Sequence, residues 1–486
     1  MSGALAVFDL GKTNSKLFVF APDGALLDER RTRPVWKDFR GRHVLDDERL
    51  FAWMSRELAE VVAMHDVVGL MVSAHGCAFA LVRGDELLHP VLDYEQEIPP
   101  SIAREIDPML PDFSETYTPW LPLGFSIARH IYWLRQEEPA AFADTEWILC
   151  YPQYWGWRFS GRPLAEWSYL GAHSQLWAPL KRDFSSLVDR LGWRQKFPEI
   201  QPAGAVIGET HVALSDGSSR SIRVHNGVHD SNAALAYYRM TGLSGFTLVS
   251  TGTWVIIINL DCPLDALDRE RDMIANVTVD GEPAPSLRFM GGREYDLISE
   301  SWNRPISQQA VERVMARGVF ALPSWAAGGP FPETSGQIVG GDVEGEDRAA
   351  VAALYVLMMT DLSLDLIRSD NLLVVDGGLA KIELLTAMLA QLRPGQTVIH
   401  SEMSEGSATG AAALAFKALG MMPFRDETVP VAASSVPGLE AYRDRWRELA
   451  GNARDAARAD NARDAARADN ARDAARADKA AKEASR

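Results

Sequence analysis

Two short stretches of the sequence carry hydroxyl, amide and carboxylate groups that could hold a phosphate. The first is "VFDLGKTNSKLFVF" at residues 7–20, where Gly-Lys-Thr suggests a nucleotide phosphate loop. A Walker loop has the pattern GxxxxGK[ST] and opens an α-helix, but Ala6 stands at the first glycine position and "SKLFVF" is typical of a strand. The sequence therefore predicts a tight β-turn-β whose amides and hydroxyls cradle phosphates. The turn residues are Gly11, Lys12, Thr13, Asn14 and Ser15, with Asp9 facing a metal ion.

One such hairpin can also be an ordinary strand connection, and Lys12 can be either a phosphate contact or a solvated turn lysine. The pattern recurs, however, at residues 246–259, "FTLVSTGTWVIIIN", where a short polar turn again separates two apolar strands. Two matching hairpins half a chain apart indicate a duplicated, two-domain α/β body with the turns facing each other across a cleft. In the second turn, the phosphate-contacting candidates are Thr251, Gly252 and Thr253.

A third element, "IRVHNGVHDSNAALAYYRM" at residues 222–240, is typical of a strand, a turn and a helix that opens at Asp230. Two roles are open for this carboxylate. It can cap the helix by accepting hydrogen bonds from unpaired backbone N–H groups, or it can take the proton of a hydroxyl that attacks a phosphorus atom. Its place just before the second hairpin favours the role of base.

Two strand-turn-helix units follow, and their glycines would let a flat ring approach the backbone. They are "NLLVVDGGLAKIELLTAMLAQL" at residues 371–392 and "VIHSEMSEGSATGAAALAFKALG" from residue 398. Ordinary strand-to-helix turns have the same composition. The predicted nucleotide contacts in the first unit are Gly377, Gly378 and Leu379.

Composition and charge exclude several classes of partner. The net charge of −17 argues against a general attraction to nucleic acid or to anionic membranes. The three cysteines are too few and too scattered for a disulfide framework or a zinc cage. The N-terminus "MSGALAVFDL" has no cationic start, and no run reaches about 18 apolar residues. We therefore expect a cytoplasmic protein with no nucleic-acid or membrane partner.

Taken in chain order, these residues resemble the FGGY family of carbohydrate kinases, within the actin-like ATPase superfamily. The resemblance extends from about residue 4 to about residue 420. The matching motifs are the first phosphate turn at Asp9, Gly11, Thr13 and Asn14, the sugar-proximal turn "SAHGCAFALV" at 73–82, the "GxHD" element at Gly227, His229 and Asp230, the second phosphate turn "STGTW" at 250–254, and the adenosine motif "DGGLAK" at 376–381.

The resemblance implies two actin-like (ribonuclease H-like) α/β domains with a cleft between them, at residues 1–240 and 241–450. It further implies ATP and Mg²⁺ as cofactors, a small-molecule sugar as partner, and a possible homodimer. Asp9 would hold the metal, and Asp230 would be the catalytic base. The implied sugar-binding residues are His75, Gly76, Asp93, Tyr94, Glu166, Trp167, His229 and Asp230.

"HDSNAAL" followed by "LVSTGTWVIIIN" is most similar to the fuculokinase and rhamnulokinase branches, which implies a 6-deoxyketohexose such as L-fuculose or L-rhamnulose. Three residues depart from those branches. Lys12 replaces a small residue, Ala78 stands where an acidic sugar ligand is usual, and His75-Gly76 is closer to xylulokinases. Another ketose of the xylulose or ribulose type, a polyol or a sugar acid therefore stays open as substrate, and so does a non-catalytic nucleotide- and sugar-binding regulator.

The C-terminal tail, residues 451–486, contains a nine-residue repeat at 453–479, "ARDAARADN" and two near-copies. Alanine with balanced Arg and Asp favours a helix. Nine residues advance 2.5 turns at about 100° per residue, so no continuous apolar stripe forms. The sequence predicts a solvated helical or disordered extension, with a docking arm for a partner as the alternative.

Overall fold

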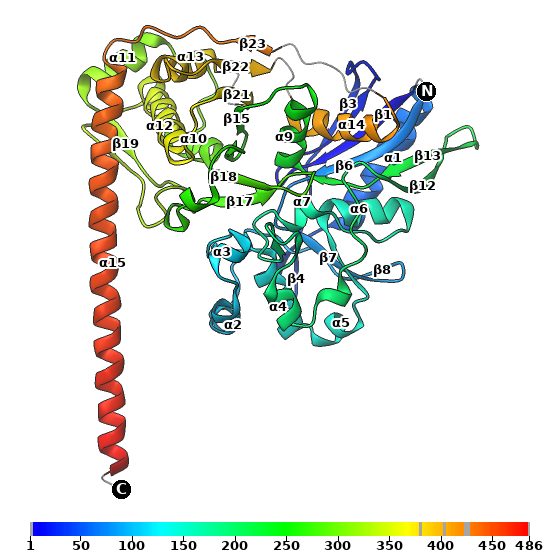
Figure 1. Ribbon diagram of the computed structural model, residues 1–486, viewed down its shortest axis with the longest axis horizontal. Coiled ribbons are helices and arrows are strands. Elements are labelled where there is room, and N and C mark those ends of the chain that lie inside the picture. The colour runs from blue at the N-terminus through cyan, green and yellow to red at the C-terminus, as the bar shows by residue number, and fades with distance from the viewer. Residues whose placement is uncertain (1–2, 379–381, 402–404, 422–427, 485–486) are drawn as a thin grey trace.

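The computed structural model describes residues 3–378, 382–401, 405–421 and 428–484. Two bodies, each built on a mixed sheet, stand side by side in Figure 1, with the N-terminal one on the right and the C-terminal one on the left. A long C-terminal helix, α15 (Leu439–Ala484), runs down the outer side of the C-terminal body.

The first sheet has the order β12-β13-β6-β1-β2-β3, and β14 pairs with β6. Its central strand β1 is apolar and almost wholly buried because both faces of the sheet are covered. β1 pairs antiparallel with β2 and parallel with β6. The strands are β1 (Ala4–Leu10), β2 (Ser15–Phe20), β3 (Leu26–Thr32), β6 (Val67–Ala74), β12 (Val206–Ala213), β13 (Ser219–His225) and β14 (Val228–His229).

The second sheet repeats this plan in the order β17-β18-β16-β15-β21-β22-β23. β15 pairs antiparallel with β16 and parallel with β21, as β1 does with β2 and β6. The predicted duplication is therefore confirmed by the strand order. The strands are β15 (Phe246–Thr251), β16 (Val255–Asn259), β17 (Ile274–Val277), β18 (Pro283–Phe289), β21 (Leu372–Gly377), β22 (Val398–Ser401) and β23 (Thr428–Pro430).

Two helices, α9 (Asp230–Met240) and α14 (Gly406–Ala418), join the two bodies. Their small side chains form one buried cluster with residues of both sheets, from Leu5 and Val7 to Leu248 and Val374. The helices approach so closely that a Cβ added at Gly410 would lie 1.9 Å from a carbonyl oxygen of α9. Alanine and glycine in this part of the sequence thus permit the contact between the domains.

Each sheet has its own core on its outer side. The first core includes α1 (Asp47–Met64) and α6 (Tyr151–Ser160), and the second is formed around α12 (Gly345–Leu366). α12 is the one helix of the described residues that is long and apolar enough to cross a membrane, but 83% of its apolar window is buried inside the protein. The other helices of the C-terminal body are α10 (Gly291–Ser299), α11 (Gln308–Arg317) and α13 (Glu383–Leu392).

A group of short elements extends the N-terminal body downward in Figure 1. Tyr94, Phe125 and His173 of this part of the chain line the cavity described below. The helices of this group are α2 (Pro100–Ile106), α3 (Phe113–Thr116), α4 (Ile127–Glu137), α5 (Pro139–Asp144), α7 (Trp167–Leu170) and α8 (Ser186–Arg190). Its strands are β4 (Trp36–Phe39), β5 (Arg42–Leu45), β7 (Phe79–Arg83), β8 (Glu86–His89), β9 (Trp147–Cys150), β10 (Trp177–Ala178) and β11 (Asp183–Phe184), and the C-terminal body adds the small pair β19 (Phe320–Leu322) and β20 (Gln337–Val339).

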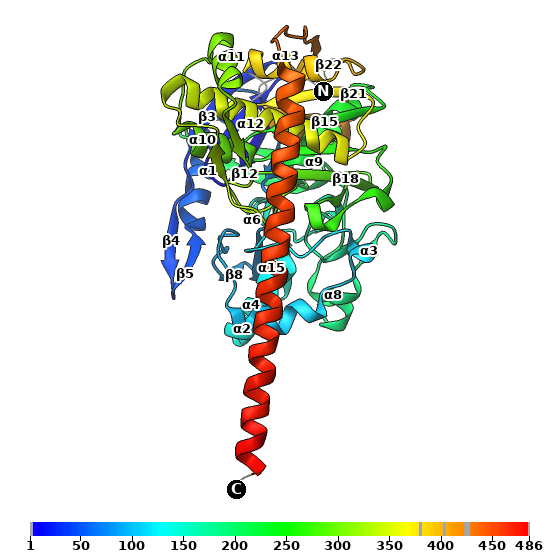
Figure 2. The ribbon, with the colours of Figure 1, turned by 90° about the vertical axis from the view of Figure 1, so that its left-hand side faces the viewer.

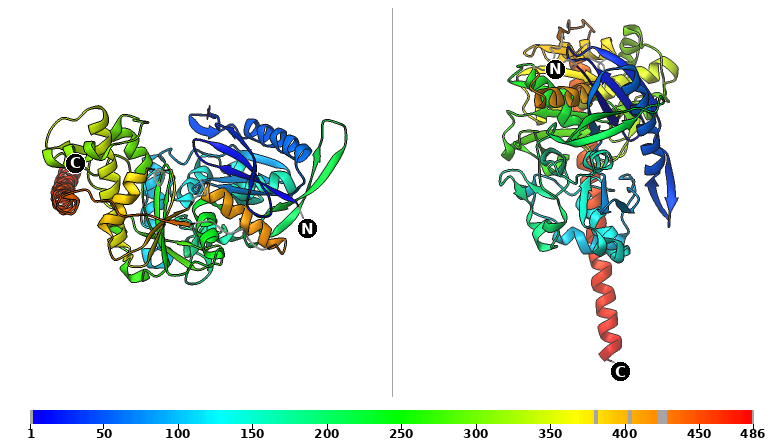
Figure 3. Two further views of the ribbon diagram at one scale, coloured as in Figure 1. Left: turned by 90° about the horizontal axis from the view of Figure 1, so that it is seen from above. Right: turned by 90° about the vertical axis from the view of Figure 1, so that its right-hand side faces the viewer.

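The tail is a continuous helix through the nine-residue repeat. α15 is anchored at its start, where the Trp446 indole N–H donates to the carbonyl of Ala321 at 2.7 Å. Arg454 and Arg458 then pair with Glu333 and Glu270. Figures 2 and 3 show that the later turns extend past both bodies to the C-terminus.

Candidate active site

A cavity of about 410 Å³ lies between the two sheets, and we call it the cleft cavity. One end, the turn end, is formed by both hairpin turns and by the glycine turn after β21. The other, the aromatic end, carries rings and polar side chains from both bodies. The turn end includes Gly11, Lys12, Lys16, Ser250, Thr251, Gly252, Thr253, Gly377 and Gly378, and the aromatic end includes His75, Gly76, Cys77, Tyr94, Phe125, His173, His229, Trp254, Asn276 and Arg288.

The first hairpin turn presents its polar groups outward. The Gly11 N–H donates to the carbonyl of Asn14 at 3.0 Å, which closes the turn. Thr13 and Asn14 are exposed and line a second hollow together with Gly252 and Thr253 of the opposite turn. The prediction that the two turns face one another is confirmed by these shared linings. Ser15 differs, because it is buried within β2 and lines neither hollow.

The second hairpin turn packs directly on the glycine turn. The Gly378 N–H donates to the carbonyl of Thr251 at 2.7 Å, and the Thr251 hydroxyl donates to the carbonyl of Asp376 at 2.6 Å. Gly377 has φ +91°, and a Cβ there would lie 1.9 Å from the oxygen of Thr251. Glycine is thus required for this contact. Leu379, also predicted here, lies outside the described residues.

Two carboxylates lie beside the turn end. Asp9 is in β1, opposite Lys16 of β2, and Asp230 is the first residue of α9. Burial, followed by the negative charge of Asp230, raises the pKa of Asp9 to about 7. Lys16 acts in the opposite direction on Asp9, and of the two carboxylates only Asp230 lines the cavity.

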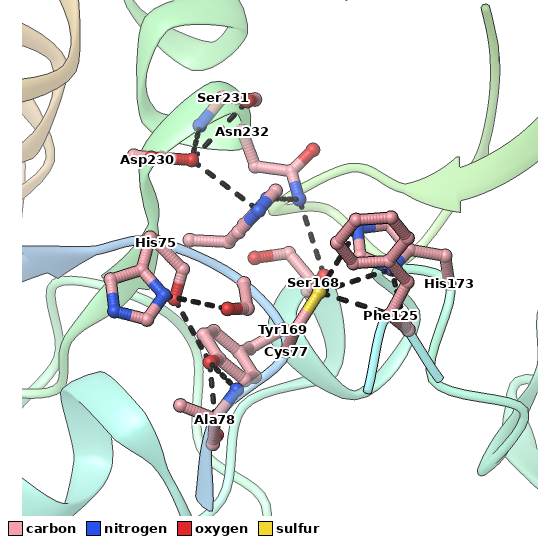
Figure 4. A network of polar contacts seen from close by, with 12 residues as sticks. His75, Cys77, Ala78, Phe125, Ser168, Tyr169, His173, Asp230, Ser231 and Asn232 are labelled. Atoms are coloured by element: carbon pink, nitrogen blue, oxygen red, sulfur yellow. Dashed lines mark hydrogen bonds and ion pairs between the residues drawn. The ribbon is translucent and has the colours of Figure 1, made fainter. Parts of the chain in front are cut away.

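Asp230 does not cap its helix in the predicted manner. The N-cap is His229, and the Asp230 carboxylate accepts the N–H of the next residue, Ser231, at 2.6 Å. Figure 4 shows Asp230 and Ser231 at the start of this helix, above His75. His229 lies 3.3 Å from the carboxylate, and the Asp230 side chain is 31% exposed. Asp230 therefore retains carboxylate surface that faces the cavity.

A series of rings forms the aromatic end. His75 lies 5.2 Å from Tyr94, Tyr94 lies 5.9 Å from Phe125, and Phe125 lies 5.4 Å from Trp254, measured between ring centroids. Burial is the main cause that lowers the pKa of His75 to about 4, so this ring is neutral at pH 7. Figure 4 shows Phe125 next to His173, whose Nδ1 lies 2.8 Å from the Phe125 carbonyl.

Three predicted sugar ligands do not line the cavity: Glu166, Trp167 and, as described below, Asp93. Glu166 is fully buried and caps α7, accepting the N–H groups of Ser168 at 2.8 Å and Tyr169 at 2.9 Å. The indole of Trp167 donates to the carbonyl of Val279 at 2.7 Å and thereby ties the N-terminal body to the C-terminal one. The sequence prediction for Glu166 and Trp167 is corrected for this reason, since their polar atoms are engaged elsewhere.

Lys12 and Asp93 were predicted as contacts of two different ligands, yet they form an ion pair with one another. Asp93 also accepts from His43 at 2.6 Å and is buried behind Lys12, outside the cavity lining. Burial is the largest single influence and would raise the pKa of Asp93, but the hydrogen bond and charge of Lys12, together with hydrogen bonds from the Glu95 backbone and His43, lower the pKa below its ordinary value. The ammonium of Lys12 also lies 3.9 Å from the ring centre of Trp36.

The described residues contain no group of three or more His, Cys, Asp or Glu side chains that could hold a metal ion. Mg²⁺ at a phosphate site needs no such group, because it binds through one or two carboxylates, phosphate oxygens and water. Asp9 and Asp230 suit this kind of site, since their charges repel each other next to the turns. The outward turn residues and Cβ-free glycines likewise suit a nucleotide triphosphate.

Comparison with known proteins agrees with this geometry. A family model described as "Carbohydrate kinase FGGY, C-terminal domain" matches residues 244–423. The crystal structure of a carbohydrate kinase from Novosphingobium aromaticivorans is 33% identical, has a TM-score of 0.80, and is matched over 93% of this chain and 99% of that one. The chain belongs to the FGGY family of carbohydrate kinases.

Enzymes of this family are ATP-dependent phosphotransferases with sugar acceptors. A xylulose kinase from Lactobacillus acidophilus shares the fold, with a TM-score of 0.77 and 14% identity over 93% of this chain and 98% of that one. A glycerol kinase from Shewanella piezotolerans is 26% identical over 272 residues, 51% of this chain and 52% of that kinase. The chain thus spans about half the length of the curated relative it matches.

Proposed function

We propose that this FGGY protein transfers a phosphoryl group from ATP to a hydroxyl of a small sugar, sugar acid or polyol bound at the aromatic end of the cleft cavity. The observation that carries the proposal is the position of Asp230, whose carboxylate faces the same cavity as both phosphate-type turns. Bound ATP would supply the transferred group, with Mg²⁺ held beside Asp9 and Asp230.

The residues of this chain would do three things. Backbone and hydroxyl groups of the turns at 11–14 and 250–253 would bind the phosphates, and the rings of Phe125 and Trp254 would pack on the acceptor. Asp230 would accept the proton of the attacking hydroxyl. Closure of the two domains, divided near residue 240, would exclude water from the transfer.

The resemblance of "STGTW" to fuculokinases and rhamnulokinases supports a 6-deoxyketohexose as a specific candidate. L-fuculose and L-rhamnulose therefore belong in the first panel of acceptors, with L-ribulose and D-xylulose beside them. A non-catalytic regulator is disfavoured by the presence of both turns and of Asp230 in one cavity.

The test is single-turnover phosphoryl transfer from ATP to this panel by the wild type and by Asp230→Asn. We expect transfer by the wild type and a loss of about 10²–10⁴-fold in the variant, the size typical of a positioned proton acceptor, with ADP affinity unchanged. A variant with near-normal turnover would show that Asp230 is not the base. An inactive wild type that binds ATP and sugar would indicate the regulator instead.

A further inference from the structure

Arg288 is buried at the aromatic end of the cleft cavity with its charge unbalanced. The residue is 4% exposed, and its Nε and Nη2 atoms have no hydrogen-bond partner. Of the cations that line this cavity within the described residues, Lys12 is neutralised by Asp93 and Lys16 by Glu405. No carboxylate of the described residues pairs with Arg288.

The groups around Arg288 do not compensate for the missing anion. The guanidinium lies 5.5 Å from the ring centre of Phe125 and 5.2 Å from that of Trp254. These rings stabilise a cation but do not accept a conventional hydrogen bond. Burial, followed by the charge of Arg288, holds the pKa of His173 well below its ordinary value, so this neighbour stays neutral. Burying an ionised group without a partner is costly, so a missing partner of opposite charge is indicated.

The register of the second sheet gives the distance between Arg288 and the turn end. Ser250 of β15 pairs with Ile256 of β16, and Ile256 pairs with Arg288 of β18. Paired residues of antiparallel strands project to the same face, and neighbouring strands are about 4.8 Å apart. The backbone of Arg288 therefore lies about 10 Å from the turn that holds Ser250. This span would allow a five- or six-carbon acceptor to reach from the turn end to the side chain of Arg288.

A second polar side chain on this wall also has an open position. Asn276 of β17 lines the cleft cavity, is 3% exposed, and its Oδ1 has no hydrogen-bond partner. An amide of this kind can accept from a substrate hydroxyl next to the anionic group. The wall thus offers one cation and one neutral acceptor to the same ligand.

We propose that the acceptor is a sugar acid, whose carboxylate pairs with the Arg288 guanidinium at the end of the molecule opposite to the hydroxyl that is phosphorylated. This inference rests on the proposed function and specifies its substrate class. Carboxylate geometry matches the in-plane N–H fork of arginine in two parallel hydrogen bonds. A neutral sugar would leave the buried charge uncompensated, because its hydroxyls contribute only dipoles.

The test compares matched acids and neutral compounds as acceptors: D-gluconate with D-glucitol, D-xylonate with xylitol, and D-glucuronate with D-glucose, beside L-fuculose and L-rhamnulose. We expect the best acid to exceed its neutral partner at least 100-fold in kcat/KM. Arg288→Met should lower kcat/KM for acids by about 10²–10³-fold, as for a truncated buried charge pair, and for neutral acceptors less than threefold. Arg288→Lys keeps the positive charge but cannot form two parallel hydrogen bonds. Its kcat/KM for acids should lie between those of the wild type and Arg288→Met.

Two controls separate this effect from misfolding and from nucleotide binding. Arg313→Met changes an exposed arginine that pairs with Asp347 on the far side of the C-terminal core and should leave all acceptors unchanged. The KM for ATP of Arg288→Met should match the wild type, and its thermal midpoint should be at least as high, because the change removes a buried charge that has no partner. Titration calorimetry should show the best acid binding to wild type and not to Arg288→Met.

The possible results separate a failure of the sugar-acid inference from a failure of the proposed kinase function. If neutral ketoses are the best acceptors and Arg288→Met slows acids and neutral sugars equally, the sugar-acid inference is wrong while the kinase proposal stands. If the variant instead loses ATP affinity, Arg288 serves the nucleotide and the inference is also wrong. If the wild type phosphorylates no acceptor of either kind, the proposed function fails and the inference fails with it.

Discussion

Asp9→Asn should make the protein more stable while lowering the rate of the proposed Mg²⁺-assisted phosphoryl transfer. Asp9 is ionisable, half-buried and repelled by Asp230, and its pKa is raised from 3.8 to about 7. At 1.36 kcal/mol per pH unit, that difference corresponds to about 4 kcal/mol of lost folding stability once Asp9 is ionised. Partial exposure to solvent reduces this figure, so we expect roughly 2–4 kcal/mol.

Whether stability rises or falls with pH depends on whether the folded or the unfolded chain binds the Asp9 proton more tightly. The folded protein keeps the Asp9 proton up to about pH 7, whereas the unfolded chain loses it near 3.8. The contribution of Asp9 to stability is therefore fully present below about pH 4, declines as pH rises to 7, and is lost above it. The asparagine variant has no such loss, so its advantage over the wild type should grow with pH.

Urea denaturation in EDTA at pH 6 and pH 8, followed by tryptophan fluorescence, would measure the difference in free energy of unfolding between Asp9→Asn and the wild type. The variant should be the more stable protein at both values, and its advantage should be about 1 kcal/mol larger at pH 8. Mg²⁺ with ADP should stabilise the wild type more than the variant. Asp23→Asn, a change at an exposed carboxylate in the turn between β2 and β3 of the same sheet, serves as control. Equal or lower stability of Asp9→Asn at pH 8 would refute the reasoning.

Other expected outcomes concern the cavity rim, the domain junction and the tail. Lys12→Met should lower the free energy of unfolding by about 3 kcal/mol, because it leaves the buried Asp93 without its lysine partner. Adding Asp93→Asn should restore most of that free energy. A loss of ATP affinity in Lys12→Met would show that Lys12 also contacts phosphate. Gly410→Ala, whose Cβ would lie 1.9 Å from a carbonyl oxygen of α9, should lower stability by about 1–3 kcal/mol, whereas Gly395→Ala, with nothing within 4 Å, should not. Deleting residues 459–486 should leave the thermal midpoint and activity unchanged, and a change of oligomeric mass in sedimentation would instead support a docking arm.

The hairpins and the helix start at Asp230 could be predicted because their signals are local. An apolar strand, a Gly/Thr/Ser turn and a second apolar strand lie within 14 residues in both halves of the chain, so no pairing between distant segments had to be known. The same holds for the strands before Asp376 and after Gly395, which the structure has as β21 and β22.

The aromatic end could not be predicted, since it depends on register and on distant partners. Arg288 lies in "APSLRFM", an otherwise apolar strand, and only its pairing with Ile256 shows which wall it joins. An arginine inside an apolar strand with no acidic residue on the adjacent strand was the available signal. The ion pair between Lys12 and Asp93 could not be predicted for the same reason, because the two residues lie 81 positions apart in the sequence.

The junction of α9 and α14 has a consequence for how the enzyme would close. Asp230 is the first residue of α9, and the flank of that helix packs on α14 within the cluster shared by the two sheets. Points near the axis of a rigid-body rotation move least. If the domains rotate about this contact, Asp230, the proposed proton acceptor, moves little, while the turn at 250–253 and Arg288 swing toward it together because they belong to one sheet. Alignment for transfer would then be set by the movement of the C-terminal sheet.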